Sequence, residues 1–268
     1  MDDVIRNVVT APGKATRLTR ERLLRLLDVL NEVPPIDAMT AHVLPGGTVN
    51  AGTGSDPRLA KWLEEVMSLE GERITASDTG AVAYWSDQVK LLVIPPFPLQ
   101  TASVSEGFDA YHLRNVVTAP RVTGVVLVRL GRYAVGVFRG GELVTSKTNT
   151  RYVKGRHKKG GSSQKRFARI REKQIFELFG KTCTVVSEKF APYEREIDFI
   201  FLGGERHTVG EFLKRCPYLQ RLEPRIMGRM LPIGEPRLRE LERMPGEIWK
   251  SVVVAHSLPQ GFPFQGLA

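Results

Sequence analysis

The sequence predicts an α+β protein in which a mixed sheet is covered by helices on both faces. After residue 120, short apolar runs of strand length alternate with longer segments of helical periodicity. Glycine-bearing turns separate the first three of these runs. The chain of 268 residues, with 42% apolar content, is also long enough to bury a sizeable core.

Five apolar runs after Pro120 are expected to form the strands of this sheet. The first three are separated by the short turns Gly131-Arg132 and Gly140-Gly141, which is typical of an antiparallel meander. The last two alternate with helical segments, and this alternation implies a mixed sheet. The expected strands are residues 124–130, 133–138, 142–149, 197–202 and 226–233.

Three helices are expected between and after these strands. The first follows Ser162, where apolar residues recur at roughly helical spacing. The second covers 208–215, with Thr208 as N-cap and Glu211 three residues later in a capping-box pattern. The third covers 236–243. The resulting order, β-β-β-α-β-α-β-α, is shared by ribonuclease H-like folds, so we expect a five-stranded sheet of that kind.

A smaller N-terminal α+β region of unknown role is predicted at residues 1–95. Amphipathic helices are expected over 20–30 and after Asp56, which is a favourable N-cap residue. Two strands are expected over 81–85 and 89–94.

The domain boundaries are predicted from composition. Residues 96–120 contain prolines and little periodicity, so we expect a linker there. The second domain is expected at residues 121–256, followed by a C-terminal tail at 257–268. No internal repeat is present in the sequence.

Positive charge is concentrated in residues 151–174, which read RYVKGRHKKGGSSQKRFARIREKQ. The segment holds ten Lys/Arg and one acid, so it contributes +9 of the net charge of +10. A local excess of this size predicts a docking surface for a polyanion, and nucleic-acid backbone is the commonest one. The candidate nucleic-acid-binding residues are Arg151, Lys154, Arg156, His157, Lys158, Lys159, Lys165, Arg166 and Arg169.

The remaining composition favours a reduced, cytoplasmic, soluble protein without a cofactor, and we expect it to be a monomer. Cys183 and Cys216 are too few for a disulfide framework, and no Cys/His cluster has metal-ligand spacing. The first residues have no signal-peptide pattern. No apolar run approaches the length of a membrane span, so we expect no membrane partner.

Common catalytic patterns are weak in this sequence. Two-metal ribonuclease H chemistry needs carboxylates, one of them on the first strand, but that strand reads TGVVLVRLG and has no acid. The P-loop order and the G-x-S-x-G pattern are both absent, so Ser162 and Ser163 are interpreted mainly as helix caps. Gln164 can orient a water or donate to an oxyanion. A lone Gly-x-x-Gln pattern, however, also fits an ordinary solvated glutamine.

The run GGSSQKRFARIR resembles the loop and helix of the catalytic domain of eukaryotic and archaeal class-one peptide release factors. In that domain a Gly-Gly-Gln loop precedes an Arg-Phe-Ala-Arg helix, and the helix motif here is Arg166, Phe167, Ala168 and Arg169. The stretches YAVGVFRGGELVTSK and IDFIFLGG resemble strands of the same domain. The resemblance covers residues 121–256, about half of the chain.

The position of the glutamine points to one branch of these proteins. With the Arg-Phe-Ala-Arg motif aligned, Ser162 occupies the glutamine position and Gln164 lies two residues later. This form of the loop is similar to that of the bacterial Vms-type (VLRF) release factors. The resemblance implies hydrolysis of peptidyl-tRNA on stalled large ribosomal subunits. It makes Gln164 the candidate catalytic residue, with Gly160, Gly161 and Ser163 as the other loop residues.

Three functions remain open on this sequence. In the leading hypothesis, the basic segment contacts rRNA at the peptidyl-transferase centre and Gln164 places water at the peptidyl-tRNA ester. The second hypothesis is a nuclease that cleaves the 3′ end of tRNA. The third is a non-catalytic ribosome- or RNA-binding protein on a release-factor scaffold. The sequence indicates no metal or organic cofactor for any of these functions.

Overall fold

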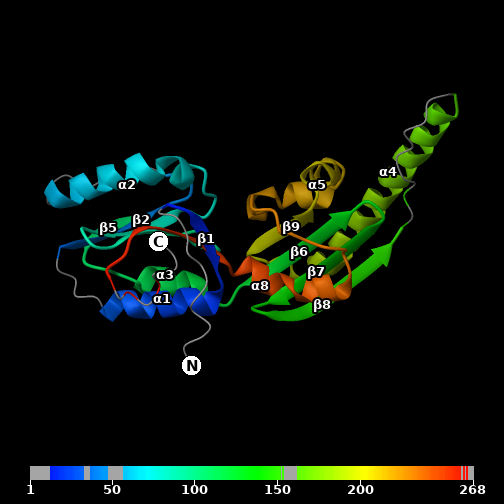
Figure 1. The fold of residues 1–268 in the computed structure, drawn as a ribbon. Coiled ribbons are helices and arrows are strands. Elements are labelled where there is room, and N and C mark those ends of the chain that lie inside the picture. The colour runs from blue at the N-terminus through cyan, green and yellow to red at the C-terminus, as the bar shows by residue number, and fades with distance from the viewer. Residues whose placement is uncertain are drawn as a thin grey trace. The chain divides into compact units, whose positions relative to one another are not determined.

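A computed structural model describes residues 13–32, 37–47, 57–151, 153, 162–260, 262 and 264, with side chains omitted for 162–165. The chain forms two compact units. Met1–Ala119 and Trp249–Ala268 make up the first unit, and Pro120–Ile248 make up the second. Each unit is built around its own sheet (Figure 1). Within the described residues, no helix is long and apolar enough to cross a membrane.

The first unit contains a six-stranded antiparallel sheet in the order β1-β10-β4-β3-β2-β5. Strands β3 and β4 lie where the sequence predicts them. Strands β1, β2, β5 and β10 were not predicted. The strands are β1 (Ala15–Leu18), β2 (Ala38–Val43), β3 (Ala81–Ser86), β4 (Lys90–Ile94), β5 (Ser103–Glu106) and β10 (Ser251–Ser257).

Helices cover both faces of this first sheet (Figure 1). Helices α1 (Arg20–Glu32) and α3 (Tyr111–Thr118) pack on the face that carries Tyr84 and Val93. Helix α2 (Pro57–Thr75) packs on the face that carries Trp85 and Leu92. Successive strand residues point to opposite faces, so each strand contributes to both apolar clusters.

Two of the predicted domain boundaries differ from the compact units of the structure. Residues 96–120 are not a linker, because they form β5 and α3, and α3 buries Leu113 and Val117 in the first core. The second domain does not extend to residue 256, because β10 lies between β1 and β4 of the first sheet. The apolar run of residues 252–255 gains ladder hydrogen bonds on both sides there.

The second unit contains a four-stranded mixed sheet in the order β8-β7-β6-β9. The first three strands form the predicted antiparallel meander, and β9 pairs in parallel with β6. These pairings confirm the α+β class with a mixed sheet. The strands are β6 (Val122–Arg129), β7 (Arg132–Arg139), β8 (Glu142–Thr150) and β9 (Phe199–Gly204).

The fifth strand predicted for this sheet, 226–233, is wrong as a regular strand. The structure has two isolated parallel bridges, which pair Ile226 with Ile200 and Leu231 with Gly203. Between them the chain bends at residues 228–229, where Gly228 weakens strand formation. The segment therefore lies beside β9 without a continuous ladder.

Helices cover both faces of the second sheet (Figure 1). The cluster on one face includes Val135 of β7 and buried residues of three helices. On the opposite face, a Cβ at Gly136 would lie 2.8 Å from Leu241. The helices are α4 (Ser162–Phe190), α5 (Arg206–Leu213) and α6 (Pro217–Arg221) on the first face, α7 (Leu238–Glu242) on the second, α8 (Met244–Ile248), and the 3-10 turns η1 (Ala191–Tyr193) and η2 (Glu223–Arg225).

The predicted cap of α5 is wrong by three residues. The helix begins at Arg206, so Glu205 is the N-cap residue and makes no side-chain cap hydrogen bond. The Thr208 hydroxyl instead donates to Glu205 Oε2 at 2.9 Å. The Ser/Thr-x-x-Glu pattern at Thr208 therefore lies inside the helix.

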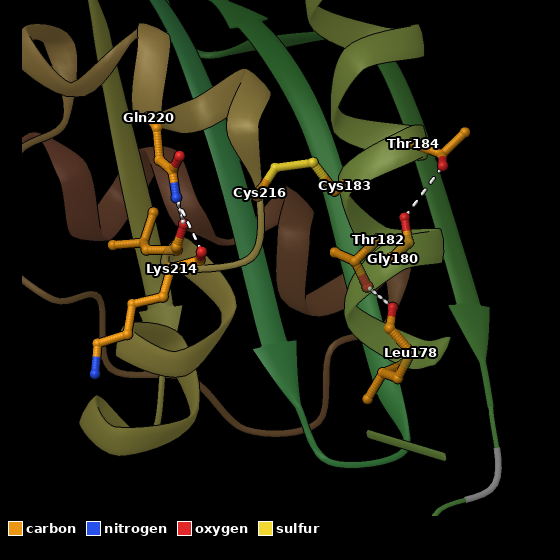
Figure 2. The surroundings of a disulfide bond; sticks show 9 residues. Leu178, Gly180, Thr182, Cys183, Thr184, Lys214, Cys216 and Gln220 are labelled. Atoms are coloured by element: carbon orange, nitrogen blue, oxygen red, sulfur yellow. Dashed lines mark hydrogen bonds between the residues drawn. A yellow bond between two sulfur atoms is a disulfide. The ribbon is translucent and has the colours of Figure 1, made fainter. Parts of the chain in front are cut away.

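A disulfide joins Cys183 of α4 to Cys216, the residue before α6 (Figure 2). The two Cα atoms lie 5.3 Å apart, although 33 residues separate them in sequence. The expectation of two reduced cysteines is wrong for this structure, because the packing of α4 on α6 brings the two side chains together. Gln220 of α6 donates to the backbone oxygens of Leu213 and Lys214, which fixes the turn that carries Cys216 (Figure 2).

Candidate functional site

The two halves of helix α4 differ in burial. The helix has 29 residues, which corresponds to about 43 Å at the usual rise of 1.5 Å per residue. No residue from 166 to 177 is buried. The C-terminal half supplies Leu178, Phe179, Val186 and Phe190 to the core. The N-terminal half therefore extends past the edge of the sheet (Figure 1).

The apolar residues whose spacing predicts α4 are not all part of the core. The periodicity correctly predicts a helix, and Phe179 is buried. Ile170 and Phe176, however, are 38% and 66% exposed. The reason is that these residues lie on the half of the helix that extends past the sheet. Helical spacing alone predicts which residues share a face, but not where the core ends.

Arg151 ties the end of β8 to the middle of α4. Its Nη2 donates to Glu177 Oε2 at 2.6 Å, and its backbone N–H donates to the Gly131 oxygen at 2.8 Å. Glu177 lies 15 residues after Ser162, or about 22 Å along the helix axis. The connection from β8 to α4 therefore starts beside Glu177 and ends at the far end of the helix.

The exposed half of α4 is cationic. Residues 166–176 contain Arg166, Arg169, Arg171 and Lys173 against Glu172, which gives +3 from four bases minus one acid. No acid lies in the first turn. Arg166 with Arg169, and Arg169 with Lys173, are like-charge pairs three and four residues apart, and each such pair destabilises a helix by about 0.2–0.5 kcal/mol. This placement does not favour folding, and it suits binding of an external anion.

The predicted catalytic residues are described only in part. The backbone places Ser163 and Gln164 in the first turn of α4, together with Lys165. Gly160 and Gly161 lie outside the described residues. So do the candidate nucleic-acid-binding residues Lys154, Arg156, His157, Lys158 and Lys159.

The predicted nucleic-acid-binding cations whose side chains the structure describes lie at different levels along the axis of α4. Arg166 and Arg169 are both exposed. Arg151 lies level with Glu177, which is 11 residues after Arg166 and therefore about 16 Å further along the axis. A ligand that contacts Arg151 and Arg166 together therefore spans about 16 Å along the helix.

A groove between α4 and α5 was not predicted from the sequence. Its volume is about 590 Å³, and its apolar lining comes from Leu130, Ile175, Phe176 and Phe179. Arg215, two residues after the end of α5, lies across from them, with its Cζ 5.9 Å from the Phe179 ring centroid. The one sequence signal for this groove is an aromatic residue, Phe176, two residues after the end of the basic segment.

Two of the three carboxylates that line the groove already have partners. Glu211 accepts hydrogen bonds from Lys214 at 2.9 Å and Arg215 at 3.0 Å. The bond from Lys214 is the main reason that the pKa of Glu211 lies below its ordinary value. Glu205 accepts the Thr208 hydroxyl. Among the described residues, no group of three His, Cys, Asp or Glu side chains is placed to hold a metal ion.

The second unit is a release-factor-like α+β domain, in which the exposed half of α4 is cationic. The chain belongs to the VLRF1 release factor family of Actinobacteria and Chloroflexi, whose model matches residues 121–254. This match confirms the resemblance noted in the sequence.

The similar proteins include archaeal release factors. Peptide chain release factor subunit 1 of Archaeoglobus fulgidus is 28% identical over 133 residues, which are 50% of this chain and 33% of that protein. The protein of the same name from Methanosphaera stadtmanae is 31% identical over 121 residues, 44% of this chain and 29% of that protein. The chain thus spans about a third of the length of these relatives. The crystal structure of the archaeal translation termination factor aRF1 matches 87% of this chain and 73% of that chain, with a TM-score of 0.39 and 16% identity.

Proposed function

We propose that this protein is a ribosome-associated peptidyl-tRNA hydrolase that releases nascent chains from stalled large ribosomal subunits. The main support is the exposed, cationic half of α4 in a chain of the VLRF1 release factor family. We also propose that the second sheet is ribonuclease H-like, because residues 226 and 231 lie beside β9 where a fifth strand would be.

The cations of the helix and of the preceding segment would neutralise phosphates of rRNA at the peptidyl-transferase centre and of the tRNA. Arg166 and Arg169 extend from the exposed side of α4. Lys154, Arg156, His157, Lys158, Lys159 and Lys165 would add to this contact. Charge neutralisation of this kind releases counterions and dominates affinity for nucleic acid.

Gln164 would act at the chemical step. Its amide would orient a water molecule whose oxygen attacks the ester carbon that joins peptide to tRNA. The ester C–O bond then breaks, the ribose oxygen of the tRNA takes a proton, and the peptide leaves as a carboxylic acid. The helix N-terminus favours the negative charge that develops on the carbonyl oxygen. Gly160 and Gly161 would allow a tight loop, and Ser163 completes the candidate site.

The remaining elements of the proposal follow from this reaction. The protein would act in the cytoplasm, as a monomer, on the large subunit and its bound peptidyl-tRNA. Water and the groups of the protein and RNA are sufficient for the ester hydrolysis, so no metal or organic cofactor is invoked.

A direct test uses the purified chain with peptidyl-tRNA on isolated large subunits. Analysis of both products separates the three functions. Free peptide with intact tRNA is the expected result. A shortened tRNA would identify a 3′-end nuclease instead. Stable binding with neither product would identify a non-catalytic binding protein.

A further inference from the structure

Phe176 lies on the same face of α4 as two of its cations. The spacing from Arg169 to Lys173 is four residues, and from Lys173 to Phe176 it is three, so the three side chains form one line along the helix. Arg169 and Lys173 are exposed, and Phe176 is 66% exposed. This line ends at the groove between α4 and α5.

The packing of the domain core does not require an aromatic residue at position 176. The core contributed by α4 begins at Leu178, two residues later. Phe176 forms one wall of the groove and leaves most of its ring accessible. Large exposed apolar side chains beside a groove are typical of binding sites.

The charge of the helix segment that leads to the groove favours an anionic ligand with a flat apolar part. The described segment that leads to Phe176 has a net charge of +3. In the groove itself, Glu211 is neutralised by Lys214 and Arg215, and Glu205 accepts the Thr208 hydroxyl. Aromatic side chains that follow a line of cations bind single-stranded nucleic acid, because each base has a π-face and each phosphate has a charge.

We propose that Phe176 stacks on an unpaired base of an RNA strand whose phosphates are bound by Arg169 and Lys173. This inference deepens the proposed function and rests on it for the source of the strand, which is RNA of the stalled complex. The base enters the groove over Phe176, and the adjacent backbone follows α4 toward its N-terminus. Arg215, which is paired with Glu211, lies on the opposite side of the groove.

The test compares binding of the full chain to a fluorescently labelled single-stranded RNA and to a blunt RNA duplex of the same length. Phe176→Ala is expected to lower the affinity for the single strand about tenfold, because one stacked base is lost. Its affinity for the duplex should stay unchanged, because paired bases are not accessible for stacking. Phe176→Trp should retain single-strand binding.

Two further variants control this experiment. Lys173→Ala removes a phosphate contact, so it should weaken binding of both RNAs and lower the salt dependence. Leu69→Ala changes an exposed apolar residue, 48% accessible, on a helix of the first unit, and both affinities should stay at the wild-type value. Thermal unfolding of Phe176→Ala should match that of the wild type, because the side chain lies outside the core.

The outcomes separate this inference from the hydrolase proposal. Unchanged single-strand affinity in Phe176→Ala overturns base stacking, whatever the wild-type protein does to peptidyl-tRNA. An equal loss for single strand and duplex also overturns it. Normal RNA binding combined with weaker binding to ribosomes would point to a protein ligand in the groove and would likewise contradict stacking. Selective loss of single-strand binding together with no peptide release by the wild type would retain stacking and reject the hydrolase proposal.

Discussion

The guanidinium of Arg151 lies 2.6 Å from the carboxylate of Glu177, so an ion pair joins the end of β8 to α4 where the helix leaves the core. Both side chains are partly exposed, at 46% and 38%. A pair of this kind contributes at most about 1 kcal/mol to stability. The position of this ion pair matters more than its contribution to stability, because it fixes where the basic connection from β8 to α4 starts.

Glu177→Gln is therefore expected to affect activity more than stability. The free energy of unfolding should fall by less than about 1 kcal/mol. Peptide release should slow by up to about 100-fold, because small displacements of a reacting group have large effects on rate. Affinity for large subunits should not fall, since the variant loses a negative charge. The matched control is Glu196→Gln, which breaks the pair with Arg139, also 2.6 Å, at the other end of the sheet. Equal rates for the two variants would contradict a positioning role for Glu177.

The disulfide between Cys183 and Cys216 should stabilise the second unit. Closing a loop of this length is expected to contribute about 3–4 kcal/mol, because it restricts the unfolded chain. A reductant should lower the midpoint of thermal unfolding of the wild type. The variant Cys183→Ala/Cys216→Ala should unfold at a lower temperature and show no response to reductant. A wild-type midpoint that is the same with and without reductant would contradict this prediction.

The buried side chain of His42 should make stability depend on pH. Burial, and then the nearby His112, lower the pKa of His42 to about 4, while Asp109 acts in the opposite direction. The unfolded chain has the ordinary value of 6.5 and binds the proton first. Stability is therefore complete above pH 6.5 and is lost as pH falls toward 4, by about 3 kcal/mol.

Replacement of His42 tests this linkage. His42→Gln keeps a polar group beside Ser103 Oγ, which lies 3.0 Å from His42 Nδ1, but it cannot titrate. The difference in unfolding free energy between wild type and variant should change between pH 6.5 and 4 and stay constant above pH 6.5. Denaturant unfolding at several pH values measures it. A difference that is constant over the whole range would show that His42 is not the titrating group.

Gly124 of β6 should be intolerant of a side chain, because Phe190 at the end of α4 packs against it. A Cβ at this position would lie 2.6 Å from Phe190 Cζ. Gly124→Ala is expected to destabilise the protein by about 1–3 kcal/mol through overpacking. Gly124→Ala/Phe190→Leu should recover part of this loss, since the smaller residue leaves room for the methyl group. Additive losses in the double variant would contradict direct overpacking.

The antiparallel part of the second sheet could be predicted from the sequence because its pairings are local. Strands β6, β7 and β8 are consecutive and are joined by tight glycine turns, so alternation and turn residues determine most of the pairing. The first sheet depends on distant pairings instead. Strand β10 pairs with β1 across most of the chain, and no local pattern specifies that partner.

Strand β2 shows why a buried strand that contains polar residues is hard to predict from the sequence. It is buried on both faces, yet it contains Thr40 and His42, which interrupt an apolar run. The Thr40 hydroxyl donates to the Gly107 oxygen at 2.7 Å, and His42 contacts Ser103. These partners lie more than 60 residues away, so the sequence alone does not indicate that such polar residues can be buried.

The candidate site could be predicted only in its chemical character. The basic segment and Gln164 stand out by composition and by their resemblance to release factors. The groove beside Phe176 depends on the packing of α5 against α4, which local periodicity does not contain. The disulfide depends on the same packing.

The measurement that tests the central claim most directly is peptide release by Gln164→Ala on large subunits that carry peptidyl-tRNA. Loss of one oxyanion or water-positioning donor is expected to slow release about 100- to 1,000-fold, while the variant folds and binds subunits normally. Gln164→Glu should also be slow, because its negative charge repels the oxyanion and the RNA phosphates. The matched control is Ser162→Ala, which should release peptide at nearly the wild-type rate. Rapid release by Gln164→Ala, with activity lost in Ser162→Ala, would contradict the assignment of Gln164 to the chemical step.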